Sequence, residues 1–257
     1  MFIYEHIVSF FLSCVVYDEN NCIEKIQKVF PRFKCHFETD EHQTFFHGVV
    51  LDSGNRRAWA VHRGTDGKDK LGRLMSWYNN LLNAKTGENG IGDGVEVNSK
   101  HWFESFKNYL YDYNTWYHTG HSKGGDDCIG TALMHCQNKS PKQKIICHPF
   151  ANFPILKNPA AAEFQSRCDA GEIECIRVLN PGDPAGDSFF RDTCGGKDIG
   201  MLITLPDINK YDPGIAGWVN HSCKMYAAAI SIYLSQDKTS DLEKYWLVGD
   251  AFKICMN

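Results

Sequence analysis

The sequence predicts an α/β protein in which a mostly parallel central sheet is covered by helices on both faces. Short runs rich in β-branched and aromatic residues alternate along the chain with longer runs whose apolar residues recur at helical spacing. This alternation is typical of parallel sheets that are buried on both faces. The 257 residues are 43% hydrophobic, which suffices for one large core, and no linker composition divides them. We therefore expect a single domain over residues 1–257.

The first part of the chain predicts two helices followed by a strand hairpin. Apolar residues at helical spacing indicate helices over residues 4–17 and 20–30. Residues 43–51 and 57–63 have strand composition and flank a turn-forming Ser-Gly-Asn sequence, as the two arms of a hairpin do.

The remaining elements alternate between helix and strand. A helix over residues 71–83 and a mobile loop over 84–99, rich in Gly, Asn, Asp and Glu, are expected before an aromatic helix over 102–111. The same two patterns then predict strands at 115–119, 144–148, 172–179 and 201–205, a helix ending near Asn138, and helices over 158–170 and 222–235.

The N-terminal apolar stretch from Ile7 to Val16 bears on the location of the protein. It has the length of a signal-peptide core, but Glu5 and His6 precede it, no Lys or Arg does, and no small-residue cleavage site follows. The eleven cysteines are odd in number and include no C-x-x-C pair, which favours a reducing compartment. We expect a buried helix and a cytoplasmic protein, with secretion as the alternative, and no apolar stretch is long enough to span a membrane.

The sequence Gly120-His121-Ser122-Lys123-Gly124 is the strongest functional signal. It has the pattern G-x-S-x-G and lies between a predicted strand and a predicted helix. A serine on such a sharp strand-to-helix turn is exposed as a nucleophile, and the flanking glycines avoid side-chain clashes in the strained turn. Ser122 is therefore the predicted catalytic nucleophile.

A serine nucleophile needs a histidine base and a carboxylate that orients the histidine. In α/β folds with this turn the chain order is serine, acid, histidine. His221, the last histidine of the chain, precedes a predicted helix and is the predicted base, although a lone histidine is more often a surface or capping residue. Asp183 directly follows a predicted strand and is the predicted acid, with Asp187 and Asp192 as rivals and turn formation as its simpler role.

The negative oxygen that forms during acyl transfer needs two hydrogen-bond donors. One is normally the backbone N–H after the nucleophile, which here belongs to Lys123. The sequence Arg63-Gly64-Thr65 ends an earlier strand, and Thr65 offers an N–H and a hydroxyl there. We predict Thr65 and Lys123 as the oxyanion donors. For Thr65 the alternative is that the Gly-Thr sequence only forms an ordinary turn.

Four segments resemble the class 3 lipases, an α/β-hydrolase family that includes fungal triacylglycerol lipases. The strand ending in Arg-Gly-Thr65 is similar to the family's oxyanion turn, and Thr119 to Gly125 is similar to its Thr-Gly-His-Ser-Leu-Gly-Gly segment. Ile176 to Pro184 is similar to the family segment that carries the catalytic acid. His221-Ser222 followed by Tyr226 is similar to the family's catalytic histidine and the helix that follows it. The resemblance covers roughly residues 40 to 235. It implies the α/β-hydrolase fold, the same triad and oxyanion residues, and a lid at residues 66–100.

Two departures from that family affect the expected substrate. Lys123 occupies a position where secreted lipases carry an apolar residue. The lid segment is also polar, whereas the lid of an interfacial lipase is amphipathic with a large apolar face. We therefore expect hydrolysis of a smaller or amphiphilic ester, such as a monoacylglycerol, a lysophospholipid or a phospholipid acyl group, rather than of bulk fat. The polar residues that support this expectation are Lys68, Asp69, Lys70 and Arg73.

The expected activity is that of a serine esterase or lipase with an acyl ester or lipid substrate and transient contact with a membrane surface. The alternative is an inactive or regulatory binding module on the same fold, since fold alone does not establish function. No cofactor and no metal is expected, because the histidines and cysteines near Ser122 lack ligand spacing. The net charge of 27 − 31 = −4 and the absence of a basic stripe exclude nucleic acid as a partner. The oligomeric state is left open.

Overall fold

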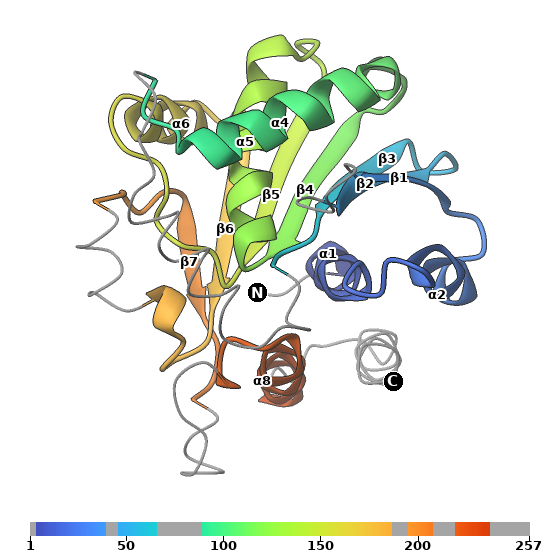
Figure 1. Cartoon of the computed structure of the whole chain (residues 1–257), viewed down its shortest axis with the longest axis vertical. Coiled ribbons are helices and arrows are strands. Elements are labelled where there is room, and N and C mark those ends of the chain that lie inside the picture. The colour runs from blue at the N-terminus through green and yellow to red at the C-terminus, as the bar shows by residue number, and fades with distance from the viewer. Residues whose placement is uncertain (1–3, 40–45, 66–88, 187–194, 208–218, 237–257) are drawn as a thin grey trace.

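The fold is built on one seven-stranded sheet whose strand order follows the chain order from β1 to β7 (Figure 1). The computed structural model describes residues 4–39, 46–65, 89–186, 195–207 and 219–236. β1 and β2 are antiparallel to their neighbours, and β3 to β7 are parallel. The strands are β1 (Lys34–Thr39), β2 (Phe46–Asp52), β3 (Arg57–His62), β4 (Thr115–His121), β5 (Lys144–Phe150), β6 (Ile173–Leu179) and β7 (Met201–Thr204).

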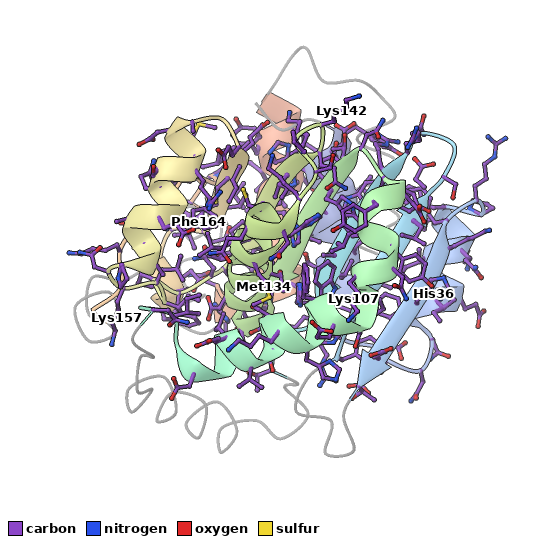
Figure 2. The ribbon with its side chains drawn as sticks, turned by 90° about the horizontal axis from the view of Figure 1, so that it is seen from above. His36, Lys107, Met134, Lys142, Lys157 and Phe164 are labelled. Carbon is purple, nitrogen blue, oxygen red and sulfur yellow. The ribbon has the colours of Figure 1, made fainter. Side chains whose placement is uncertain are left out.

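One face of the sheet is covered by the helices that connect its parallel strands. α4 (Asp93–Phe106) and the 3-10 helix η1 (Lys107–Asp112) precede β4, α5 (Lys123–Asn138) joins β4 to β5, and α6 (Ala160–Asp169) joins β5 to β6. Parallel strands are joined by right-handed crossovers, and strands added in one direction place every crossover on the same face. Buried side chains fill the layer between these helices and the sheet. Figure 2 shows how wide the sheet is, with His36 of β1 toward one side of the molecule and Phe164 of α6 toward the other.

The opposite face is covered by helices from the two ends of the chain. α1 (Tyr4–Val15), α2 (Cys22–Val29) and α8 (Cys223–Gln236) lie together on this side in Figure 1. Ile7 and Phe11 of α1 and Ile230 of α8 share a buried cluster with Trp59 of β3 and Tyr117 of β4. Because the crossovers leave this face bare, the apolar N-terminal stretch is needed to bury it. The prediction of a buried N-terminal helix is thus confirmed.

The predicted α/β architecture is confirmed, with a mostly parallel sheet between two helical layers. Strand β1 was not predicted, because residues 34–39 alternate weakly and most of their side chains are exposed. The predicted loop over 84–99 is wrong from Asp93 onward. There α4 begins, and its buried Val95, Asn98, Ser99 and Trp102 have helical spacing that the polar composition obscured.

Several expectations concern residues outside those described. The predicted helix over 71–83 and most of the segment proposed as a lid, residues 66–88, lie there. Within the described end of that segment, residues 89–100, α4 begins at Asp93 and packs on α5, where Asn98 binds Asp127. Over the described ranges, no helix combines the length and the apolarity needed to cross a bilayer.

Candidate active site

Ser122 forms the sharp turn between β4 and α5, at the edge of the sheet where the parallel strands end. Its backbone has φ 59° and ψ −129°, a conformation that residues with a side chain rarely adopt. Neighbouring backbone leaves no room for Cβ atoms beside it: one on Gly120 would meet the carbonyl of Gly124, and one on Gly124 would meet the carbonyl of His62. The two glycines of the G-x-S-x-G pattern therefore make this turn possible.

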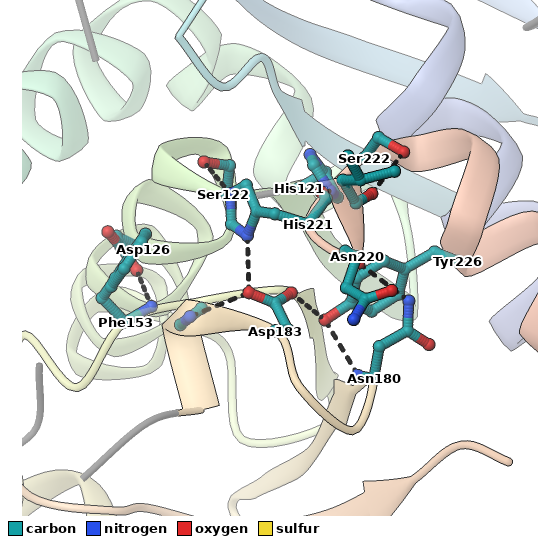
Figure 3. A network of polar contacts seen from close by, with 12 residues as sticks. His121, Ser122, Asp126, Phe153, Asn180, Asp183, Asn220, His221, Ser222 and Tyr226 are labelled. Atoms are coloured by element: carbon teal, nitrogen blue, oxygen red, sulfur yellow. Dashed lines mark hydrogen bonds and ion pairs between the residues drawn. The ribbon is translucent and has the colours of Figure 1, made fainter. Parts of the chain in front are cut away.

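Three predicted residues from distant parts of the chain meet in one hydrogen-bonded row (Figure 3). The hydroxyl of Ser122 lies 2.8 Å from Nε2 of His221, and Nδ1 of His221 lies 2.8 Å from Oδ1 of Asp183. All three side chains are buried. With the proton of His221 on Nδ1, that nitrogen donates to the carboxylate and Nε2 accepts from the serine. The geometry is the one that a serine nucleophile requires of its base and acid.

Asp183 is held by more than the histidine. The hydroxyl of Tyr226 donates to Oδ2 at 2.6 Å, and the N–H of Ala185 donates to Oδ1 at 2.8 Å. Burial disfavours the charged carboxylate, but the hydrogen bond and charge of His221 and the bonds from Tyr226 and Ala185 outweigh it, so the pKa of Asp183 is lowered. The carboxylate therefore stays ionised where it faces the imidazole. Its rivals Asp187 and Asp192 lie outside the described residues.

The loop that carries His221 is fixed by two further contacts. Nε2 of His121 donates to the carbonyl oxygen of His221 at 2.7 Å, and Nδ1 of His121 lies 3.0 Å from the hydroxyl of Tyr17. The side-chain amide of Asn180 donates to the carbonyl of Asn220 at 3.0 Å. No sequence pattern predicts these supporting residues. Tyr17 and His121 are 104 positions apart in the chain, so no local pattern connects them.

Of the two predicted oxyanion residues, Lys123 directly follows the nucleophile, and Thr65 follows Gly64, which packs against it. Gly64 is packed so closely that an added Cβ would lie 3.2 Å from Cβ of Ser122. The hydroxyl oxygen of the adjacent Thr65 is buried and has no hydrogen-bond partner among the described residues. Lys123 is the first residue of α5, and the leading N–H groups of a helix have no acceptor within it. Two donors are thus available close to Ser122.

The side chain of Lys123 is engaged along the helix. Its ammonium group donates to Asp127 Oδ2 at 2.9 Å, and Asn98 of α4 donates to both oxygens of the same carboxylate. Burial raises the pKa of Asp127, although Lys123 and Asn98 oppose this effect. Asp126 next to it accepts a hydrogen bond from the backbone N–H of Phe153 at 2.8 Å (Figure 3). Asp127 therefore joins α5 to α4, and Lys123 supplies the cation beside this buried carboxylate.

Comparisons with known proteins agree with the fold. No protein-family model and no curated protein matches the sequence. Among solved structures, a triacylglycerol lipase from Penicillium expansum is 16% identical, with a TM-score of 0.57 over 78% of this chain and 77% of that one. Lipase II from Rhizopus niveus is 14% identical, with a TM-score of 0.59 over 79% and 82%. M37 lipase is 13% identical, with a TM-score of 0.61 over 98% and 99%. The chain has the α/β-hydrolase fold of these lipases.

Proposed function

We propose that this protein is a serine hydrolase that cleaves carboxylic esters through an acyl-enzyme. The observation that carries the proposal is the row of hydrogen bonds, each 2.8 Å long, from Ser122 through His221 to Asp183. A neutral serine hydroxyl is a weak nucleophile unless a base accepts its proton. Here the base, the group that orients it and the strained turn that presents the serine occur together at the end of parallel strands, where α/β active sites form.

In the proposed reaction, Oγ of Ser122 attacks the ester carbonyl carbon while Nε2 of His221 accepts the hydroxyl proton. The C–O bond to the alcohol then breaks, and the imidazolium returns the proton to the departing oxygen. Water repeats the sequence on the acyl-enzyme, with His221 as base and then as acid, and releases the carboxylic acid. Asp183 remains ionised throughout and stabilises the imidazolium, which agrees with its lowered pKa.

Thr65 and the N–H of Lys123 are proposed to stabilise the developing oxyanion. The buried Thr65 hydroxyl oxygen without a hydrogen-bond partner among the described residues supports this role. Thr65→Val keeps the shape of the side chain and removes the hydroxyl, so kcat is expected to fall about 100-fold with little change in KM. Steady-state kinetics on a soluble ester measure this. A Thr65→Ser variant, which keeps the hydroxyl, serves as the control and retains most of the activity; equal losses in both variants would contradict the role.

For the substrate we propose a small or amphiphilic ester rather than bulk fat. Two of the solved structures with this fold are named triacylglycerol lipases, which supports a lipid-like acyl group. The polar composition of residues 66–94 argues against a large apolar lid and for a monoacylglycerol, a lysophospholipid or a phospholipid acyl group. Transient contact with a membrane surface and a cytoplasmic location fit such a substrate. A panel of esters with graded chain lengths, offered below and above their solubility limit, tests the choice.

The first experiment is intact-mass analysis after labelling with a fluorophosphonate. One adduct is expected on the wild-type protein and none on Ser122→Ala or His221→Ala, because the probe reacts with serines whose hydroxyl is activated. Circular dichroism checks that both variants are folded. An unlabelled, folded wild-type protein would favour the binding-module alternative. The ammonium group of Lys123, which follows the nucleophile, forms an ion pair with Asp127, and this engagement supports the hydrolase over the binding module.

A further inference from the structure

Glu38, His47 and His101 form a second cluster of chemically active side chains, apart from the Ser122 row. Their potential ligand atoms all lie within 4.8 Å of one another. None of the three has a role in the proposed ester hydrolysis. The three residues are too far apart in the chain to form a recognisable ligand motif.

The fold brings the three residues together from three elements. Glu38 of β1 and His47 of β2 are directly paired across the antiparallel strands, so both side chains project from the same face of the sheet. That face is covered by α4, which contributes His101. Nε2 of His47 lies 3.1 Å from Nδ1 of His101, although the two residues are 54 positions apart. Each element thus supplies one ligand atom to the same point.

The donor set matches the preferences of a divalent transition-metal ion. Two imidazole nitrogens and one carboxylate are ligands that Zn²⁺ takes in tetrahedral sites, with Zn–N distances of about 2.0–2.1 Å. Two nitrogens bound to one tetrahedral ion are then about 3.3 Å apart, which is close to the 3.1 Å between His47 and His101. One negative carboxylate also compensates part of the charge of the ion.

The burial of the three residues suits metal binding as well. His47 is 1% exposed and is fixed between neighbouring rings, with His62 and Phe106 at centroid distances of 5.8 and 6.0 Å. Glu38 and His101 are exposed, so an ion can reach the cluster from solvent. A rigid inner ligand with two accessible outer ligands resembles a preformed site more than a chance meeting of surface side chains, which are mobile.

We propose that Glu38, His47 and His101 bind a divalent transition-metal ion of the Zn²⁺ type, with water in the fourth position. The ion joins β1 and β2 to α4 at the antiparallel end of the sheet. β2 is hydrogen-bonded to β3, the strand that leads to Thr65, so the ion stabilises the part of the sheet beside the proposed oxyanion turn. The site supplies no group to the ester reaction, and its test does not depend on that activity.

Calorimetric titration of the chelator-treated full-length protein with Zn²⁺ tests the proposal. One site is expected, and saturating Zn²⁺ raises the Tm, because an ion that binds only the folded state stabilises it. Glu38→Gln and His101→Ala change exposed residues and leave the fold intact. Each is expected to weaken binding at least tenfold, since even the loss of an outer-shell partner costs that much. His36→Ala, two residues from Glu38 on the same face of β1, is the matched control and binds like the wild type.

Titration with Co²⁺ separates this site from binding to thiols. Nitrogen and oxygen ligands in a tetrahedral site give visible absorption without the near-ultraviolet bands of a cobalt–thiolate bond. The expected visible bands disappear in His101→Ala. The proposal is overturned if the wild-type protein binds neither ion, if His101→Ala binds as tightly as the wild type, or if the spectrum shows thiolate ligation that the substitution leaves unchanged.

Discussion

At the scale of single residues, Asp183 is the best-anchored group in the site. It accepts hydrogen bonds from His221, Tyr226 and the N–H of Ala185, which together satisfy both carboxylate oxygens. The acid is buried, so it tolerates its charge only because these donors are present. The same donors fix its direction, and through it the direction of the imidazole ring toward Ser122.

Asp183→Asn should therefore leave the fold nearly unchanged and abolish most of the activity. The amide carries no charge to stabilise the imidazolium, and its NH2 group can donate to Nδ1 of His221, which places the wrong tautomer of the imidazole toward Ser122. By comparison with triads of this kind we expect kcat to fall about 10⁴-fold. Kinetics and circular dichroism measure the two effects. A loss of less than tenfold would mean that another carboxylate is the acid.

Lys123 is predicted to contribute to stability rather than to chemistry through its side chain. Lys123→Leu leaves the buried carboxylate of Asp127 without its cation, which is expected to cost about 3 kcal/mol of unfolding free energy. Urea denaturation measures the loss. Activity per folded molecule is expected to persist, because the proposed donor at this position is the backbone N–H.

The double variant Lys123→Leu with Asp127→Asn provides the control for that prediction. A neutral amide no longer needs the cation and still accepts a hydrogen bond from Asn98, so the double variant is expected to regain part of the lost stability. If the double variant is less stable than Lys123→Leu alone, the buried charge is not the cause. A large loss of kcat in the single variant would instead assign the ammonium group a role in catalysis.

At the scale of elements, the turn between β4 and α5 has a strained backbone at Ser122, and Gly120 and Gly124 make this turn possible. The strain at Ser122 is maintained by its surroundings: its N–H donates to Phe150 of β5 and its carbonyl accepts from Gly125 of α5. Such a turn can form only where the strand, the turn and the helix pack closely together. The reason for Gly120 is local, because its Cβ would meet the carbonyl of Gly124, whereas the Cβ of Gly124 would meet the backbone of His62 in the neighbouring strand. The turn could be predicted from sequence because both glycines directly flank the serine segment between a predicted strand and a predicted helix.

Gly124→Ala is expected to destabilise the protein by about 3 kcal/mol, because its Cβ would meet the backbone of His62 and Arg63 in the neighbouring strand and the loop after it. The loss is measured by thermal or urea unfolding, together with labelling of Ser122 by the fluorophosphonate. Gly94→Ala is the matched control: Gly94 also lies at a helix N-terminus, but an added Cβ meets no atom within 4 Å. Equal stability of the two variants would contradict the close fit of the turn.

At the scale of the whole molecule, buried histidines lie on both faces of the sheet. His6 of α1 stacks on His148 of β5, with ring centroids 4.0 Å apart, and His118 of β4 lies 3.0 Å from His135 of α5. Burial lowers the pKa of His6 to about 4 and that of His135 to about 3. Both rings are therefore neutral in the folded protein at pH values where the unfolded chain binds protons.

The free energy of unfolding is accordingly predicted to fall as the pH is lowered. The unfolded histidines have a pKa of about 6.5, so below that pH the unfolded state binds more protons and gains stability. The loss extends from about pH 6.5 down to the folded values, with a slope of up to about 1.4 kcal/mol per pH unit for each histidine. Urea unfolding at several pH values between about 7 and 5 measures this slope.

His6→Phe tests the assignment of that slope. The phenyl ring retains the stacking surface toward His148, and the substitution removes one titrating group. The dependence of the unfolding free energy on pH is therefore expected to decrease by the contribution of one histidine. His36→Gln, at an exposed position on β1, is the control for replacing a histidine outside the core. A slope that His6→Phe does not alter would show that the acid sensitivity arises elsewhere.

The sequence by itself determined the architecture and the three residues of the hydrogen-bonded row. Ser122, Asp183 and His221 could be selected because each is marked locally: a glycine-flanked turn, the end of a strand, and a loop before a helix. The regular elements were predictable for the same reason, since their apolar spacing is a local property. Where polar composition masked that spacing, as at the start of α4, the prediction failed.

Only the tertiary structure decided which residues support these groups. The contact of Tyr17 with His121, the bond from His121 to the carbonyl of His221, and the meeting of His47 with His101 join positions 104, 100 and 54 residues apart. Such contacts depend on strand order, register and the placement of helices, and no local pattern encodes them. The ion pair of Lys123 with Asp127 is by contrast a local contact, four residues along α5. Tertiary packing decided only that the Asp127 carboxylate is buried.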